Sequence, residues 1–206
     1  MYQTIEKQET FELTEKKSKF IANLIYVKSK QEAEQKIKEY KKKFYTARHN
    51  CFAYRVLEDS GIYERFSDDG EPSGTAGAPM LNILQKNNLC NVIVIVTRYF
   101  GGILLGTGGL VRAYSDCTIG AVNGAKKFNL QLGEEVEVEV AYADFKQFMH
   151  YCKVNEIRIA KSDYKEFVVC KLEINEEKKK KILYDVEFKK INVNKIDVIG
   201  KTYIIE

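Results

Sequence analysis

The sequence predicts an α+β protein with two domains, residues 1–130 and 131–206. Three observations predict this class. Two kinds of segment follow each other along the chain. In one, apolar and polar residues alternate, as is typical of half-buried strands, and in the other, apolar residues recur at helical spacing. Residues 92–96 are apolar at every position, which indicates an interior strand covered on both faces. After the boundary the patterns follow the order strand, helix, strand, strand, helix, strand, which is that of a ferredoxin-like domain.

The composition is that of a globular protein, because 45% of the 206 residues are hydrophobic. The net charge of +4 permits an anionic partner without requiring one. The five cysteines are scattered without a Cys-x-x-Cys pair, so we expect reduced, buried thiols rather than a disulfide framework or a zinc site. The apolar runs are too short for a membrane span and no leader opens the chain, so we expect a cytoplasmic protein with no membrane attachment.

The first domain begins with a predicted hairpin. Residues 2–13 and 19–27 carry alternating aromatic and β-branched residues, with a polar turn at 15–18 between them. Ser29 is expected to cap a helix over residues 31–44. The lysine run at its end, and a second run in the other domain, are interpreted as solvent-exposed helix faces.

The rest of the first domain completes an expected β-α-β-α order. Residues 47–57 alternate as a strand, which places His49 and Cys51 on the same face. A short helix is expected to begin near Pro79 and to precede the apolar strand. A second helix follows the glycine segment, with its first apolar residue at Leu110.

The second domain is expected to begin with a strand over residues 135–142. Asp144 is expected to cap the first helix. The remaining predicted elements are a helix to about residue 155, a strand pair at 157–163 and 167–174, a helix over 176–188 and a closing strand region at 193–205.

Two loops beside the apolar strand contain the candidate functional residues. Strand, glycine turn and helix is the arrangement that directs backbone N–H groups and a helix N-terminus at an anion. Arginine is scarce in this lysine-rich chain, and five of its six arginines lie in or just before this region, which favours bidentate recognition of phosphate or carboxylate. The candidate anion-binding or nucleic-acid-binding residues are Arg48, His49, Arg98, Gly101, Gly102, Gly106, Gly108, Gly109 and Arg112.

An acidic loop precedes these residues and leaves several interpretations open. Asp68, Asp69 and Glu71 could hold a hard cation, form turns, or pair with the arginines of the same chain. Ser73 and Thr75 are expected to cap the following helix rather than to act as nucleophiles. We therefore predict no metal and no cofactor.

The sequence contains no complete set of catalytic residues. The glycine segment lacks both the Gly-Lys-Ser/Thr of a P-loop and the spacing of a dinucleotide site. His49 could lower the pKa of the Cys51 thiol, but no third orienting residue is identifiable. Catalytic activity is thus left open, with a non-enzymatic protein favoured.

The acidic loop and the glycine segment together resemble the signature of the IMPACT/YigZ family. The residues that carry the resemblance are 66–77, 97–102 and 105–114, and residues 47–51 also fit. The resemblance implies a first domain like the second domain of a small-subunit ribosomal protein. It also implies a second domain similar to domain V of elongation factor G. The eukaryotic relatives in this family are translation regulators that bind an activator of the amino-acid-starvation kinase. That binding is attributed largely to another, N-terminal domain of those relatives, so the resemblance does not imply regulation of this kinase here.

These observations support three hypotheses. The leading one is a non-enzymatic, translation-associated protein that binds RNA or the ribosome. The first alternative is a small-molecule or metal-dependent hydrolase-like enzyme that uses His49, Asp68, Asp69 and Glu71. The second alternative is a protein–protein adaptor, and the oligomeric state is left open.

Overall fold

The computed structural model describes residues 2–58 and 61–205, and the chain divides into two compact units, Met1–Asn129 and Leu130–Glu206. Both combine sheets with helices, so the α+β class is confirmed. The elements of the first unit are β1 (Gln3–Ile5), β2 (Glu9–Glu15), β3 (Ser18–Tyr26), α1 (Lys30–Lys43), β4 (His49–Glu58), β5 (Gly61–Ser67), α2 (Gly77–Lys86), β6 (Val92–Tyr99) and α3 (Gly106–Gly124). Those that follow are β7 (Lys127–Val140), α4 (Tyr142–Val154), β8 (Arg158–Tyr164), β9 (Val168–Ile174), α5 (Glu176–Glu187) and β10 (Lys195–Ile205).

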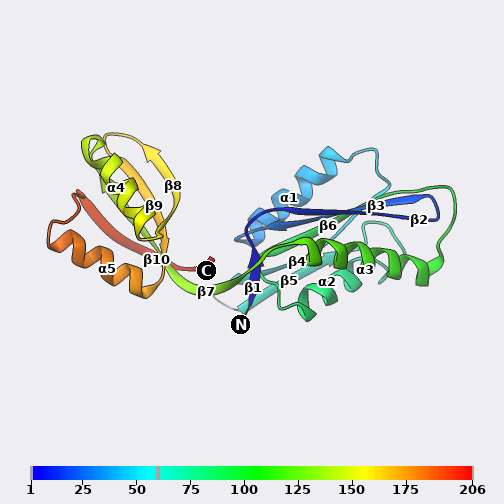
Figure 1. Cartoon of the computed structure of the whole chain (residues 1–206). Coiled ribbons are helices and arrows are strands. Elements are labelled where there is room, and N and C mark those ends of the chain that lie inside the picture. Colours follow the sequence, from blue (N-terminus) through cyan, green and yellow to red (C-terminus); the bar gives the residue numbers. More distant parts are fainter. Residues whose placement is uncertain (1, 59–60, 206) are drawn as a thin grey trace. The chain divides into compact units, whose positions relative to one another are not determined.

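The first unit is a twisted antiparallel sheet of order β2-β3-β6-β4-β5 with helices on both faces (Figure 1). The central strand β6 supplies both cores. Val92, Val94 and Val96 face the core under α2 and α3, whereas Ile93 and Ile95 face the core under α1. The prediction of an interior strand over residues 92–96 is therefore confirmed.

The predicted hairpin is present, but its first strand is shorter than expected. Of the predicted first strand, only the part from Glu9 onward, β2, pairs with β3. The turn between them contains Lys16 and Lys17, with φ of 44° and 66°. Residues 3–5 form the separate strand β1, which pairs with the start of β7. The prediction of one strand over residues 2–13 was wrong, because β1 finds its partner more than a hundred residues away. The edge strand β5 was not predicted.

The helix starts show which caps local sequence could predict. The Ser29 hydroxyl accepts a hydrogen bond from the Glu32 amide, so that cap is confirmed. Helix α2 begins at Gly77 behind Ala76, and neither Ser73 nor Thr75 caps it. The Thr75 hydroxyl instead donates to the Pro72 carbonyl at 2.7 Å. That capping prediction was wrong because the cap comes from the more distant Asp68.

Helix α3 also differs from its prediction. It begins at Gly106, so Gly106, Gly108 and Gly109 form its first turn rather than a loop. The helix packs closely on the hairpin: a Cβ atom at Gly120 would lie 2.3 Å from the Phe11 ring. Glycine at that position allows this contact.

The second unit is an antiparallel sheet of order β10-β7-β9-β8, built in the order β-α-β-β-α-β (Figure 1). This is the ferredoxin-like arrangement. Phe148 of α4 and Ile182 of α5 join the same core as the inward residues of the sheet. Asp144 does not cap α4, whose N-cap is Ala141; its carboxylate accepts from the Asn192 amide instead. In the part of the chain that the structure describes, no helix combines the length and hydrophobicity needed to cross a membrane.

Candidate functional site

A pocket of about 310 Å³ lies in the first unit where β4 begins, β6 ends and α3 starts. The strands place their ends side by side, since His49 of β4 pairs with Arg98 of β6. The acidic loop closes a third side. The lining residues are Arg48, His49, Gly70, Glu71, Pro72, Arg98, Phe100, Leu104, Leu105, Gly106, Thr107 and Leu110.

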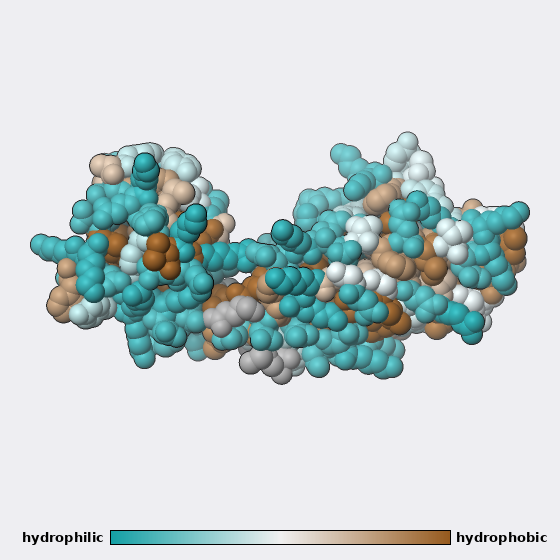
Figure 2. All heavy atoms as spheres, viewed as in Figure 1, coloured by the Kyte–Doolittle hydropathy of each residue, from teal (hydrophilic) through white to brown (hydrophobic). Residues whose placement is uncertain are grey.

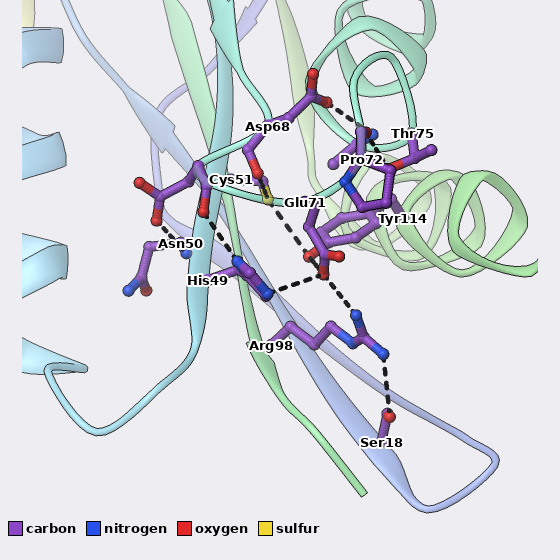
Figure 3. A network of polar contacts seen from close by, with 12 residues as sticks. Ser18, His49, Asn50, Cys51, Asp68, Glu71, Pro72, Thr75, Arg98 and Tyr114 are labelled. Carbon is purple, nitrogen blue, oxygen red and sulfur yellow. Dashed lines mark hydrogen bonds and ion pairs between the residues drawn. The ribbon is translucent and has the colours of Figure 1, made fainter. Parts of the chain in front are cut away.

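Glu71 is the centre of a buried polar network beside this pocket (Figure 3). Its Oε1 atom accepts hydrogen bonds from Arg98 Nη1 at 2.6 Å and from the Tyr114 hydroxyl at 2.8 Å. Burial, with the neighbouring Cys51 and Glu71, raises the pKa of Tyr114, so its hydroxyl stays protonated and donates. The ion pair compensates two charges that would otherwise be costly to bury.

Arg98 is 5% exposed and is held by more than its carboxylate partner. Its guanidinium lies 5.4 Å from the centroid of the Phe20 ring and 5.6 Å from that of Phe100. The Nη2 atom contacts Ser18 Oγ at 3.5 Å, while Nε has no hydrogen-bond partner among the described residues. Arg98 is therefore a fixed part of the pocket floor with its charge balanced by Glu71.

His49 is oriented by the backbone of the acidic loop. Its Nδ1 atom lies 2.9 Å from the Asp69 carbonyl oxygen, and a carbonyl can only accept, so Nδ1 carries the proton. The other ring nitrogen, Nε2, lies 3.8 Å from Glu71 Oε1. The Asp69 carboxylate accepts from the Asn50 amide at 2.7 Å and pairs with Lys41 at 2.5 Å.

Asp68 is bound to the backbone rather than available for chemistry. Its carboxylate accepts hydrogen bonds from the amides of Gly74, Ala76 and Gly77 at 2.9–3.0 Å, which caps α2. The Cys51 thiol donates to the Asp68 carbonyl and is fully buried, and burial raises its pKa. A thiol of this kind is not an activated nucleophile. Within residues 2–58 and 61–205, no group of three or more His, Cys, Asp or Glu side chains is arranged to hold a metal ion.

Two of the five candidate glycines, Gly101 and Gly109, lie against other parts of the chain, and the other three face open space. Gly101 permits a close backbone contact, because a Cβ atom there would lie 2.0 Å from the carbonyl carbon of Lys17. Gly102 and Gly106 adopt φ of +87° and +73° with open space around them, and Gly108 is also open. Gly109 lies against the Leu105 side chain. Of the five, Gly106 lines the pocket.

Two of the three candidate arginines meet at the pocket, and the third lies elsewhere. Arg48 is exposed at the rim of the pocket, 5.7 Å from the Phe100 ring centroid, and Arg98 lies on the floor. Arg112 lines a separate hollow of about 210 Å³ together with Glu15, Lys16 and Asp116. Arg48 forms no ion pair with any residue that the structure describes.

Sequence reasoning missed the apolar part of the site. The segment between β6 and α3 exposes Phe100, Ile103 and Leu104, with Leu104 82% exposed. Figure 2 shows hydrophobic surface at the end of this unit that carries this segment. Three consecutive aliphatic residues, 103–105, inside a glycine-rich segment were the available signal.

On the sheet of the second unit, the face away from the buried valines carries charged side chains of both signs. Glu135, Glu137 and Glu139 of β7 lie opposite residues of β9 and β10 on the face away from its buried valines. Lys171 pairs with Glu135 and Lys195 with Asp197. This face is charged of both signs, unlike the aromatic, basic sheet of an RNA-recognition domain.

Comparison with known proteins places this site inside a family domain. The model of the Impact N-terminal domain matches residues 16–122, more than half of the chain. IMPACT family member YvyE of Bacillus subtilis is 49% identical over 113 residues, which cover 55% of this chain and 52% of that protein. IMPACT family member YigZ of Escherichia coli is 43% identical over 111 residues, covering 53% and 52%. These alignments span about half the length of the curated relatives.

A solved structure extends the likeness to both units. The crystal structure of a hypothetical protein aligns with a TM-score of 0.65 and 28% identity, over 97% of this chain and 96% of that one. With the domain match over most of the first unit, the conclusion is that the chain belongs to the IMPACT family.

Proposed function

We propose that the protein is a non-enzymatic regulator of translation that binds a partner protein at the α3 pocket. Family membership supports the link to translation, as does the expected likeness of the two domains to a ribosomal protein and to elongation factor G. A non-enzymatic role is supported because the side chains that could act in catalysis are buried or already bound to other groups of the protein. Asp68 caps α2, Cys51 is buried, and Glu71 is paired with Arg98.

The observation that carries the proposal is the exposed apolar rim. Phe100 and Leu104 line the pocket and are exposed, and Ile103 and Val111, which are near them in the sequence, are exposed too. Exposed apolar side chains that cluster at a pocket are typical of protein–protein interaction sites. The charges beneath them are balanced, so burial of this rim by a partner would not leave the Arg98–Glu71 pair uncompensated.

Cosedimentation with purified ribosomes tests this proposal. We expect the protein to associate with ribosomes, and Leu104→Ser to lose most of the association. Leu132→Ser is the matched control, because Leu132 is also an exposed leucine but lies in the second unit. Association through apolar contacts should persist at about 0.5 M salt, where exposed charge interactions are screened. Equal behaviour of the two variants, or no association of the wild type, would contradict the proposal.

A second candidate function is RNA binding by residues 41–48, next to the pocket. This segment contains three consecutive lysines, the exposed Arg48, and Tyr45, which is 81% exposed. Basic groups beside an exposed aromatic ring are typical of single-stranded RNA binding. Helix α1 ends beside the acidic loop, since Lys41 pairs with Asp69.

Fluorescence anisotropy with a single-stranded RNA, measured against salt, tests this second candidate. Lys42→Gln with Arg48→Gln should weaken binding and lower the salt slope by about 1 for each phosphate that is no longer neutralised. Lys180→Gln with Lys181→Gln removes two charges from α5 and is the control. RNA affinity that is equal in both double variants, or too weak to measure in the wild type, would exclude a role of this segment in RNA binding.

A further inference from the structure

Residues 100–105, which join β6 to α3, form one wall of the α3 pocket, and we call this segment the strap. Phe100, Leu104 and Leu105 of the strap line the pocket, and Leu104 is 82% exposed. The strap contains neither helix nor strand. The contacts that hold it therefore determine whether this wall of the pocket is fixed or can move.

One hydrogen bond joins the strap to the rest of the described chain. The Gly101 amide donates to the Ser18 hydroxyl at 3.2 Å. Ser18 is fully buried, and its Oγ atom also accepts from Arg98 Nη2 at 3.5 Å (Figure 3). Leu105 adds an apolar contact with the core under α3. A segment held by so few bonds opens at a lower free energy than the strand and helix beside it.

The support for this hydrogen bond is the tip of the β2–β3 hairpin. Lys16 and Lys17 form its two-residue turn with φ of 44° and 66°, and Ser18 follows. Turns with positive φ at both positions favour asparagine and glycine. Other residues keep this conformation where the surrounding structure fixes it, and the Gly101 backbone lies directly against Lys17. The tip is therefore a rigid partner for the strap.

Two glycines flank the aliphatic residues 103–105. Gly102 and Gly106 have φ of +87° and +73°, with open space where a Cβ atom would lie. Glycine adopts positive and negative φ with similar ease, so the backbone can rotate at both positions without a steric clash. Hinges are usually a few such residues at the ends of a moving segment.

We propose that the strap opens and closes over the α3 pocket, with Ser18 as the positioning residue that latches it closed. Opening breaks the hydrogen bond from Gly101 to Ser18, and Gly102 and Gly106 absorb the change in backbone angles. The leucines of the strap then leave the pocket wall, so the pocket becomes wider than its closed volume of about 310 Å³. This inference goes beyond the proposed function, because it concerns the protein without a partner.

Nitrogen-15 relaxation dispersion of the full chain tests the latch. Opening of a lid falls in the range of times that this measurement detects. We expect Ser18→Ala to raise the population of the open form about fivefold, since one hydrogen bond no longer holds the closed form. The amides of β6 report global opening and should show no dispersion. Thr14→Ala removes an exposed hydroxyl from β2 of the same hairpin and should leave the strap unchanged.

A second pair of variants tests the hinge without touching the latch. Gly102→Ala places a side chain in open space but at a φ of +87°, so it disfavours the closed form. We expect the open population to rise about fivefold or more. Gly108→Ala is the matched control, because Gly108 also faces open space but has no positive φ, and it should leave that population unchanged. Thermal melting checks that the variants are folded.

Three outcomes would overturn the inference. The first is an absence of dispersion at the strap amides in both Ser18→Ala and Gly102→Ala. The second is dispersion of equal population in β6, which indicates that the whole sheet opens. The third is an equal effect of Gly102→Ala and Gly108→Ala. The proposed function is tested separately, since cosedimentation compares two surface leucines and does not measure the open population.

Discussion

Each unit contains a nearly buried carboxylate that accepts a tyrosine hydroxyl and a cation, but the two cations differ in their access to water. In the first unit Glu71 binds Tyr114 and Arg98, whose side chain is 6% exposed. In the second unit Asp185 binds Tyr151 and Lys190, whose side chain is 56% exposed.

This difference in exposure distinguishes the Asp185 network, a structural polar contact, from the Glu71 network, which belongs to a candidate site. Lys190 can return to water if its partner is removed, so the Asp185 network costs little to maintain. Arg98 is buried and cannot do so as easily, so the protein keeps an almost fully buried ion pair beside an open pocket. Buried ion pairs contribute little net stability compared with apolar residues. Retaining one here is consistent with a role in positioning the pocket.

The largest expected effect on the free energy of unfolding comes from replacing the buried carboxylate of each unit. Glu71→Ala leaves Arg98 buried without its partner, and we expect a loss of about 3–5 kcal/mol in the free energy of unfolding. Asp185→Ala loses a buried hydrogen bond while Lys190 becomes solvated, and we expect about 1–2 kcal/mol. Urea denaturation followed by circular dichroism measures both. Equal losses would show that the exposure of the cation does not matter.

A smaller difference is expected for the helix caps of the two units. The Asp68 carboxylate accepts from the amides of Ala76 and Gly77 at the start of α2 and from that of Gly74 in the loop before it, whereas the Asn175 side chain accepts from the Lys178 amide at the start of α5. We expect Asp68→Ala to cost about 2 kcal/mol and Asn175→Ala about 1 kcal/mol of unfolding free energy. Asp68→Asn keeps one acceptor oxygen and should lie between wild type and Asp68→Ala. A cost for Asn175→Ala above that for Asp68→Ala would contradict this ranking.

The smallest effect is an acid-dependent loss of stability from Asp185. The Tyr151 hydroxyl, together with Lys190, lowers the pKa of Asp185 below its usual range. A lowered pKa in the folded state contributes stability above the unfolded pKa, about 3.9, which is lost as pH falls toward the folded value. Tyr151→Phe should therefore be less stable than wild type at pH 6, with a difference that shrinks below about pH 4. Denaturation at a series of pH values measures this, and a pH-independent difference would assign the effect to packing alone.

The candidate site was only partly accessible to prediction. The resemblance drew attention to segments that meet at the pocket, and the possibility that the arginines pair with carboxylates of the same chain describes Arg98 and Glu71. Which arginine forms an ion pair with which carboxylate depends on strand register, because His49 and Arg98 meet only through the pairing of β4 with β6. Arg112 lies on α3 and faces another hollow.

By itself the sequence determined the features that depend on neighbours along the chain. The uniformly apolar run at 92–96 determined a strand buried on both faces, Ser29 determined a helix start, and the later periodicities determined a ferredoxin-like order. These follow from local periodicity and capping, which require no partner element.

Only the tertiary structure decided the features in which distant segments meet. It assigned β1 to the start of β7, made Asp68 rather than Ser73 or Thr75 the cap of α2, and enclosed the Arg98–Glu71 pair beneath an apolar rim. Strand pairing and the reach of buried side chains are non-local, so many alternatives satisfy the same local pattern. Packing selects among them because buried polar groups must find partners.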